Sequence, residues 1–146
     1  MDYMSNLSRF FKQNKAKQEN GKYAPTASLT DENGKPLEFE FKHITSKENE
    51  ALREKHTQDI PITGKPGMYR QKLNTSAYVA DMIVASTVYP DLYNKELQDS
   101  YGVKKPADLL FAMVDNPGEY QDFELWMQKF QGFTDLETKV DEAKNS

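Results

Sequence analysis

The sequence predicts an α+β protein: a mostly helical single domain in which a small N-terminal β-hairpin packs on a helical core. Residues Asn74 to Tyr89 have the pattern of a helix that is apolar on nearly every side, with Asp81 as its only charge. Such a helix is normally buried, with other elements packed around it. Residues 37–42 alternate strictly between apolar and charged side chains, which is typical of a strand with one buried face.

Length and composition limit the classes of protein. The chain has 146 residues, which favours one domain with a real core. Its net charge of −4, from 19 basic and 23 acidic residues without a basic stripe, argues against nucleic acid as the main partner. The lack of cysteine excludes disulfides and thiolate metal sites. The N-terminal stretch has no long apolar core, so we expect no signal peptide, no membrane-spanning segment and a cytoplasmic location.

An N-terminal segment, residues 1–20, is predicted to be a short helix or a flexible arm. Leu7, Phe10 and Phe11 fall on one side of that helix. Few other residues in the segment are apolar, so we expect it to be ordered only when it is docked. Its lysines suit an anionic surface or, more simply, a solvated face.

The predicted β-hairpin covers residues 22–44, at the start of a globular domain that extends over residues 21–133. Leu37, Phe39 and Phe41 share one face of its second arm, and an Asn-Gly pair supplies the turn. Because a lone hairpin is marginally stable in water, this apolar face must pack on the helices.

Helix-capping signals mark the helical part of the domain. Asparagine precedes three of the predicted helices, and Thr45 with Glu48 forms the pattern of a capping box. The last helix carries a stripe of large apolar residues, in which Trp126 is either a core residue or an interface anchor. The predicted helices are Ser46–Thr57, Asn74–Tyr89, Asn94–Tyr101, Pro106–Val114 and 117–131.

Two segments are predicted to lie outside the helical core. Gln58 to Leu73 contains two prolines and two glycines, which mark a loop. A structureless connection of this length is usually functional or disordered, so we expect it to become ordered on binding. Residues 134–146 are charged and poor in apolar side chains, and are predicted to be a flexible tail.

A search for catalytic groups assembles no site. His43 and His56 are the only histidines, and neither lies in a metal-ligand spacing. No nucleophile motif or phosphate-binding loop is present, so we expect no enzyme, no metal and no cofactor. Asp81 is interpreted as a structural residue that meets Arg70, Lys72 or a helix cap, or that reaches solvent.

Apolar side chains that point away from the predicted core are the candidates for partner binding. Some lie in the segments expected to be mobile, and the others lie on the outer sides of helices. These residues are Phe10, Phe11, Met68, Tyr69, Tyr101, Phe111 and Leu125.

Several runs in the C-terminal half resemble the XkdN-like family of phage tail assembly chaperones. The strand around Phe39 and Phe41 and the Glu50–Arg53 helix fit the same pattern, and the resemblance covers roughly residues 35–133. The runs in question are 88–94, 96–103, 106–110, 116–120 and 131–133.

This resemblance implies a small protein of a phage or prophage tail module that acts in the bacterial host cytoplasm. Such chaperones bind the long, apolar tape measure protein and keep it soluble while tail tube subunits polymerise around it. The tail tube protein is a second candidate partner, and homo-oligomerisation stays open. The family offers no catalytic residues. The alternative is a structural tail or baseplate adaptor of the virion.

Overall fold

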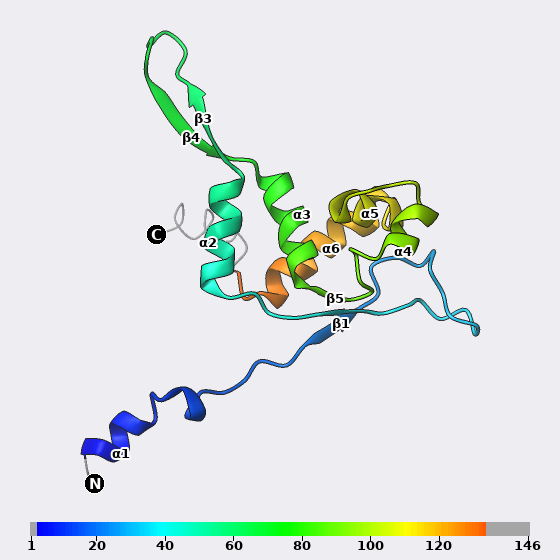
Figure 1. The fold of residues 1–146 in the computed structure, drawn as a ribbon, viewed down its shortest axis with the longest axis horizontal. Coiled ribbons are helices and arrows are strands. Elements are labelled where there is room, and N and C mark those ends of the chain that lie inside the picture. Colours follow the sequence, from blue (N-terminus) through cyan, green and yellow to red (C-terminus); the bar gives the residue numbers. More distant parts are fainter. Residues whose placement is uncertain (1–2, 134–146) are drawn as a thin grey trace, which may run out of the picture.

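The computed structural model describes residues 3–133, so the predicted tail at 134–146 lies outside the described residues. A helical body carries two segments that project from opposite sides (Figure 1). The helices are α1 (Tyr3–Ser8), η1, a 3₁₀ turn (Lys12–Asn14), α2 (Ser46–Lys55), α3 (Thr75–Ser86), α4 (Lys95–Ser100), α5 (Pro106–Met113) and α6 (Pro117–Phe130). The strands are β1 (Gly21–Tyr23), β2 (Phe39–Phe41), β3 (Thr57–Pro61), β4 (Tyr69–Leu73) and β5 (Thr87–Tyr89).

The apolar helix α3 lies at the centre of the body, as predicted. It packs against α2, α5 and α6, and most of its side chains are buried on every side. The side chain of Asn74 caps it by accepting a hydrogen bond from the backbone N–H of Ala77. The predicted end at Tyr89 is wrong, because α3 ends at Ser86 and the next three residues form the strand β5.

The first sheet has three antiparallel strands in the order β1-β2-β5. The predicted pairing within residues 22–44 is confirmed, since Tyr23 lies opposite Phe39 in the ladder. The strands are shorter than predicted, however, and Leu37 is 43% exposed because it precedes β2. The predicted Asn-Gly turn closes only a small bridge between Thr30 and Pro36 within a long connection. The strand β5 was not predicted at all.

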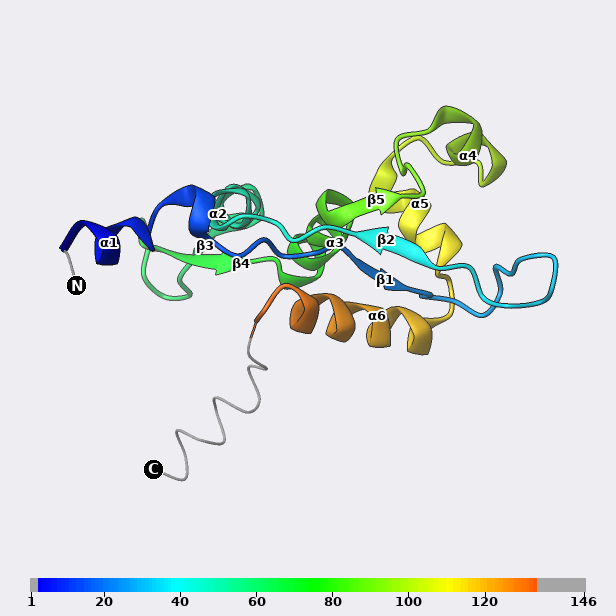
Figure 2. The same cartoon turned by 90° about the horizontal axis from the view of Figure 1, so that it is seen from below.

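Helix α6 lies along one face of this sheet (Figure 2). Aromatic rings fill the space between them. The Trp126 ring stacks on those of Tyr23 and Phe130, with centroids 4.6 and 4.9 Å apart, and Phe130 stacks on His43 at 3.9 Å. A Cβ atom on Gly21 would lie 2.5 Å from the Phe130 ring, so the close approach of β1 to α6 requires glycine there. Trp126 is therefore partly buried and packs against the core.

The end of α6 is joined to the rest of the body by one side-chain amide. Gln131 Oε1 accepts a hydrogen bond of 2.9 Å from the backbone N–H of Ile44. Gln131 Nε2 donates to Ser86 Oγ at 2.8 Å and to the carbonyl oxygen of Lys42 at 3.2 Å. One residue thus connects the segment after β2, the end of α3 and the end of α6.

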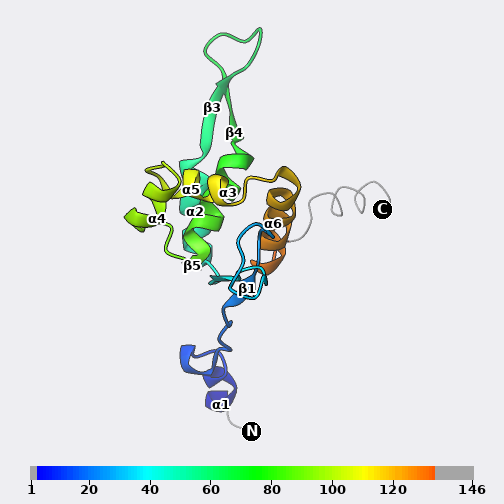
Figure 3. The same ribbon diagram turned by 90° about the vertical axis from the view of Figure 1, so that its right-hand side faces the viewer.

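The segment predicted as a loop, residues 58–73, is a second β-hairpin. Strands β3 and β4 pair in an unbroken antiparallel register from Thr57 opposite Leu73 to Pro61 opposite Tyr69. Most of the prolines and glycines lie in the turn that joins the strands, where Gly64 has a φ of 77°. Their density therefore marked the turn and not the whole segment. The hairpin projects from the end of the body (Figure 3).

Candidate interaction surfaces

Among residues 3–133, no three His, Asp or Glu side chains lie close enough together to hold a metal ion. In the same range, no helix has the length and apolar character that crossing a membrane requires. Several surfaces of the described residues expose large apolar side chains.

The junction between the body and the β3–β4 hairpin is held by Asp81. Its Oδ2 atom lies 2.6 Å from His56 Nε2 and 2.9 Å from Lys55 Nζ. Of the predicted alternatives, Arg70 and Lys72 are wrong, because the two cations beside Asp81 are Lys55 and His56. The alternative of a helix cap is the one observed. His56 caps the C-terminus of α2 directly before β3. Asp81 thus fixes the end of α2, from which the hairpin starts.

Asp81 makes the stability of the domain depend on pH. Burial alone would raise its pKa, but the hydrogen bonds and charges of Lys55 and His56 outweigh burial and lower the pKa below its usual value. The stabilisation is therefore complete above the unfolded-state pKa of about 3.9 and is lost as the pH falls through the lowered folded-state pKa. We expect Asp81→Asn to lower the free energy of unfolding by about 1 kcal/mol at pH 7, because Lys55 is largely exposed.

Urea unfolding of both proteins at pH 7 and at pH 3 checks this expectation. The difference between wild type and Asp81→Asn should shrink at the lower pH. An equal difference at both pH values would mean that Asp81 acts through its shape and not through its charge.

The β3–β4 hairpin has two different faces. Side chains alternate along each strand, and the register aligns them across the pair. One face carries apolar side chains towards the turn and polar ones, two of them basic, towards the body: Gln58, Ile60, Ile62, Met68, Arg70 and Lys72. The other face carries Thr57, Asp59, Pro61, Tyr69, Gln71 and Leu73. Tyr69 is 61% exposed, and Met68 is also exposed.

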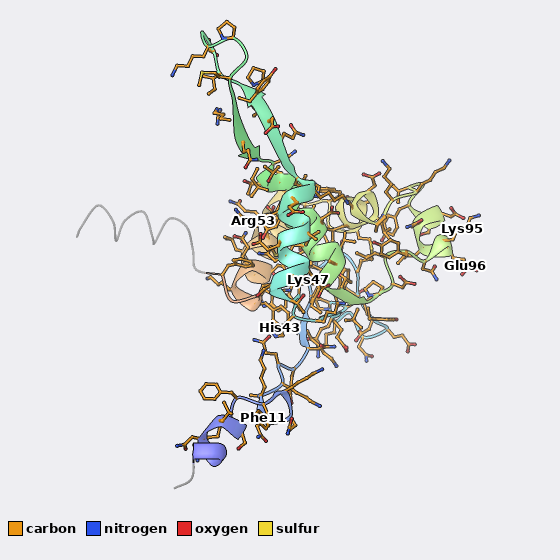
Figure 4. The ribbon with its side chains drawn as sticks, turned by 60° about the vertical axis from the view of Figure 1, so that its left-hand side comes forward. Phe11, His43, Lys47, Arg53, Lys95 and Glu96 are labelled. Atoms are coloured by element: carbon orange, nitrogen blue, oxygen red, sulfur yellow. The ribbon has the colours of Figure 1, made fainter. Side chains whose placement is uncertain are left out.

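The N-terminal arm projects on the opposite side of the molecule from the hairpin (Figure 1). Phe10 is 84% exposed, and Leu7 and Phe11 are exposed as well. Figure 4 shows Phe11 on the arm, beyond the point at which His43 marks the edge of the body. Lys15 and Lys17 line an open groove with Lys42 and His43. The arm thus presents aromatic rings next to positive charge.

A third apolar surface was missed by sequence reasoning. Tyr89 is 68% exposed and Tyr93 is 69% exposed, and Val88, which precedes Tyr89 in β5, is also exposed. The sequence pattern places Val88 and Tyr89 at the end of a buried helix and Tyr93 in a connection. For that reason it does not indicate them as contacts. The Pro-Asp sequence that follows Tyr89 is a turn signal and could have indicated that the chain leaves the core at this point.

The remaining candidates lie on the helices of the body. Leu125 and Phe111 are exposed, as expected. The Phe111 ring also packs on Tyr120, with the ring centroids 4.8 Å apart. Burial and the nearby Glu124 raise the pKa of Tyr120 to about 12. Tyr101 differs from the prediction, because it is half-buried and packs against the core.

Comparison with known proteins identifies the family. The profile of the phage XkdN-like tail assembly chaperone proteins matches residues 7–144, which is nearly the whole chain. The chain belongs to this family. The matched range includes the projecting hairpin and part of the N-terminal arm.

Two proteins of Bacillus subtilis strain 168 are similar to this XkdN-like chain. Phage-like element PBSX protein XkdN is 28% identical over 121 residues, which cover 80% of this chain and 78% of XkdN. Protein YqbN is 29% identical over 121 residues, with the same coverage of 80% and 78%. The crystal structure of YqbN superposes with a TM-score of 0.71 at 23% identity, covering 88% of this chain and 97% of the YqbN chain. That superposition supports the fold.

Membership of the XkdN-like family agrees with the surfaces described above. Tail assembly chaperones are not a class of enzymes, and residues 3–133 contain no metal-binding cluster. The family name implies partners among phage tail proteins. The hairpin and the arm both expose large apolar side chains.

Proposed function

We propose that this protein binds the tape measure protein of its phage or prophage and keeps it soluble in the host cytoplasm while the tail tube assembles. The observation that supports this proposal is that this XkdN-like chain carries two projecting segments (Figure 1), each of which exposes large apolar side chains among polar ones. A chaperone of this kind has to cover apolar surface on its client while remaining soluble itself, which this arrangement allows.

The proposed contacts are exposed apolar side chains on the two projecting segments and on the outer surface of the helices. Phe10 and Phe11 belong to the arm, and Met68 and Tyr69 belong to the hairpin. Phe111 and Leu125 extend the surface onto the body, whereas Tyr101 contributes only its exposed part. Several weak contacts of this kind suffice if many copies bind along one long client, because avidity multiplies their effect.

The organisation of the chain in this proposal has three parts. Residues 1–20 act as a binding arm, residues 21–133 form the globular domain, and residues 134–146 act as a charged tail. The tail tube protein is a second partner, and self-association would align several copies on one client.

Co-expression with the tape measure protein of the same phage or prophage tests the proposed function. We expect the soluble fraction of the tape measure protein to rise several-fold with the wild-type chain. The double variant Phe10→Ser/Phe11→Ser should lose much of this effect. The matched control is Lys12→Ser/Gln13→Ser, which changes two exposed residues of the same arm and should retain it. No gain in solubility with the wild-type chain would refute the proposal.

A structural adaptor of the tail or baseplate is the alternative function. Quantitative mass spectrometry of purified mature particles separates the two functions, because an adaptor stays in the virion. A chaperone should be absent from the particles or present far below the level of the tail proteins. Stoichiometric amounts of this chain in the particles would favour the adaptor.

A further inference from the structure

The backbone hydrogen bonds of the β3–β4 hairpin define which groups are left free. The N–H of Ile62 donates to the carbonyl oxygen of Met68 at 3.0 Å, and the N–H of Asn74 donates to that of His56 at 2.8 Å. In an antiparallel pair, hydrogen-bonded positions alternate with positions whose backbone groups point outward. The register therefore turns the N–H and C=O groups of Tyr69, Gln71 and Leu73 away from β3.

The two outer edges of the hairpin are not equivalent. On β3 the outward position near the turn is Pro61, which has no N–H group and so blocks the addition of another strand. The residues of β4 include no proline, and its outward N–H groups are intact. Within residues 3–133 no strand pairs with the outer edge of β4, because the second sheet consists of β3 and β4 alone. An unpaired edge of this kind is a template for an added strand.

The side chains of β4 indicate what kind of strand fits this edge. Arg70 and Lys72 project to one face, and Tyr69, Gln71 and Leu73 project to the other. A strand that pairs with β4 would place alternate side chains next to the two cations and next to the two apolar residues. Acidic residues on one face and apolar residues on the other would complement this pattern.

A second copy of this chain fits the edge poorly. Antiparallel pairing of two β4 strands about Gln71 would place Arg70 opposite Lys72 of the second copy, twice. Like charges directly opposite each other in a sheet are destabilising. The charges of β4 therefore favour a different protein as the occupant.

We infer that the outer edge of β4 binds an extended segment of the client, in which acidic and apolar residues alternate, as a third strand of the hairpin. Backbone hydrogen bonds at Tyr69 and Gln71 supply the binding, and Arg70 and Lys72 select acidic side chains. This inference rests on the proposed function in one respect, namely that the client is the tape measure protein. The projection of the hairpin into solvent leaves room for the added strand (Figures 3 and 4).

A proline scan of the two edges tests this inference. Gln71→Pro removes an outward N–H from β4, and it should leave the β3–β4 ladder intact because that N–H does not bond to β3. Asp59→Pro is the matched control, since Asp59 is the directly paired residue on the outer edge of β3. Circular dichroism and melting temperature should show that both variants fold.

The probe is a fluorescent, end-capped eight-residue peptide in which valine alternates with glutamate. A second peptide with lysine in place of glutamate serves as its control. By fluorescence anisotropy, wild type and Asp59→Pro should bind the glutamate peptide, and Gln71→Pro should bind it at least tenfold more weakly. The lysine peptide should not bind. Equal binding by Gln71→Pro and wild type, or equal binding of both peptides, would overturn the inference.

Charge reversal provides a second test that leaves the backbone unchanged. The variant Arg70→Glu/Lys72→Glu should no longer bind the glutamate peptide and should bind the lysine peptide instead. If the variant still prefers the glutamate peptide, the inference is also overturned.

The co-expression assay with the tape measure protein distinguishes a failure of this inference from a failure of the proposed function. If Gln71→Pro keeps the tape measure protein as soluble as wild type does, the edge inference fails and the proposed function stands. If the wild-type chain itself does not raise the soluble fraction of the tape measure protein, the proposed function fails. The peptide-binding measurements still test the inference about the outer edge of β4.

Discussion

Replacing Phe123 with alanine is expected to lower the free energy of unfolding by about 4 kcal/mol. The Phe123 side chain is fully buried. Its ring lies 5.5 Å from that of Tyr23 and 5.5 Å from that of Phe41, measured between centroids. It therefore fills the space between α6 and the three-stranded sheet, and its removal leaves a cavity that these rings cannot close. Since domains have only about 5–15 kcal/mol of stability in total, the variant should be marginally folded.

Urea unfolding followed by far-UV circular dichroism measures this loss. The matched control is Leu125→Ala on the same helix, where the side chain is 48% exposed. Its free energy of unfolding should change by no more than about 0.5 kcal/mol. Equal losses in the two variants would show that α6 does not pack on the sheet through the face that carries Phe123.

The helices could be predicted because their signals are local. Asn74, Asn94 and Asn116 each accept a hydrogen bond from a backbone N–H three residues later, as the capping pattern indicates. The capping box of Thr45 and Glu48 is also present, with both of its hydrogen bonds. Such contacts form within one turn of helix and depend little on the rest of the chain.

The strands were harder to predict because distant pairing decides them. Residues 87–89 continue an apolar run, and although Thr, Val and Tyr are common in strands, three residues are too few to separate the last turn of a helix from a short strand. Pairing of Thr87 with Phe41, which is far away in the chain, makes them β5. The β3–β4 hairpin was missed for a different reason. Its strands are polar because most of their side chains face solvent, so the alternation that identifies a half-buried strand is absent.

The candidate surface was predicted in part. The exposure on which the choice of residues depended is observed for six of the seven, and Tyr101 is the exception. Their role in binding stays a proposal. The outer edge of β4 could not have been predicted, because it exists only once the register of the hairpin is known. Similarly, the ion pair of Asp81 depends on how α2 packs against α3.

Replacing Gln131 with alanine is expected to lower the free energy of unfolding by about 2–3 kcal/mol. The amide serves three partners on different segments: the N–H of Ile44, the hydroxyl of Ser86 and the carbonyl oxygen of Lys42. Ser86 is fully buried. The Ser86 hydroxyl donates its proton to the carbonyl oxygen of Met82 at 2.7 Å. In the Gln131→Ala variant the hydroxyl oxygen therefore no longer accepts a hydrogen bond from residue 131. A buried polar group that loses its partner costs more than the hydrogen bond contributed.

Gln128→Ala is the matched control for this prediction, because it removes the same type of side chain near the same end of α6. The Gln128 side chain donates only to the carbonyl oxygen of Glu124, one turn earlier in α6. Its loss should therefore change the free energy of unfolding by no more than about 0.5 kcal/mol. Urea unfolding of the two variants side by side gives the comparison. If Gln131→Ala were no less stable than Gln128→Ala, the amide would not be what holds the end of α6 to the sheet and to α3, and the aromatic rings alone would have to fix that helix in place.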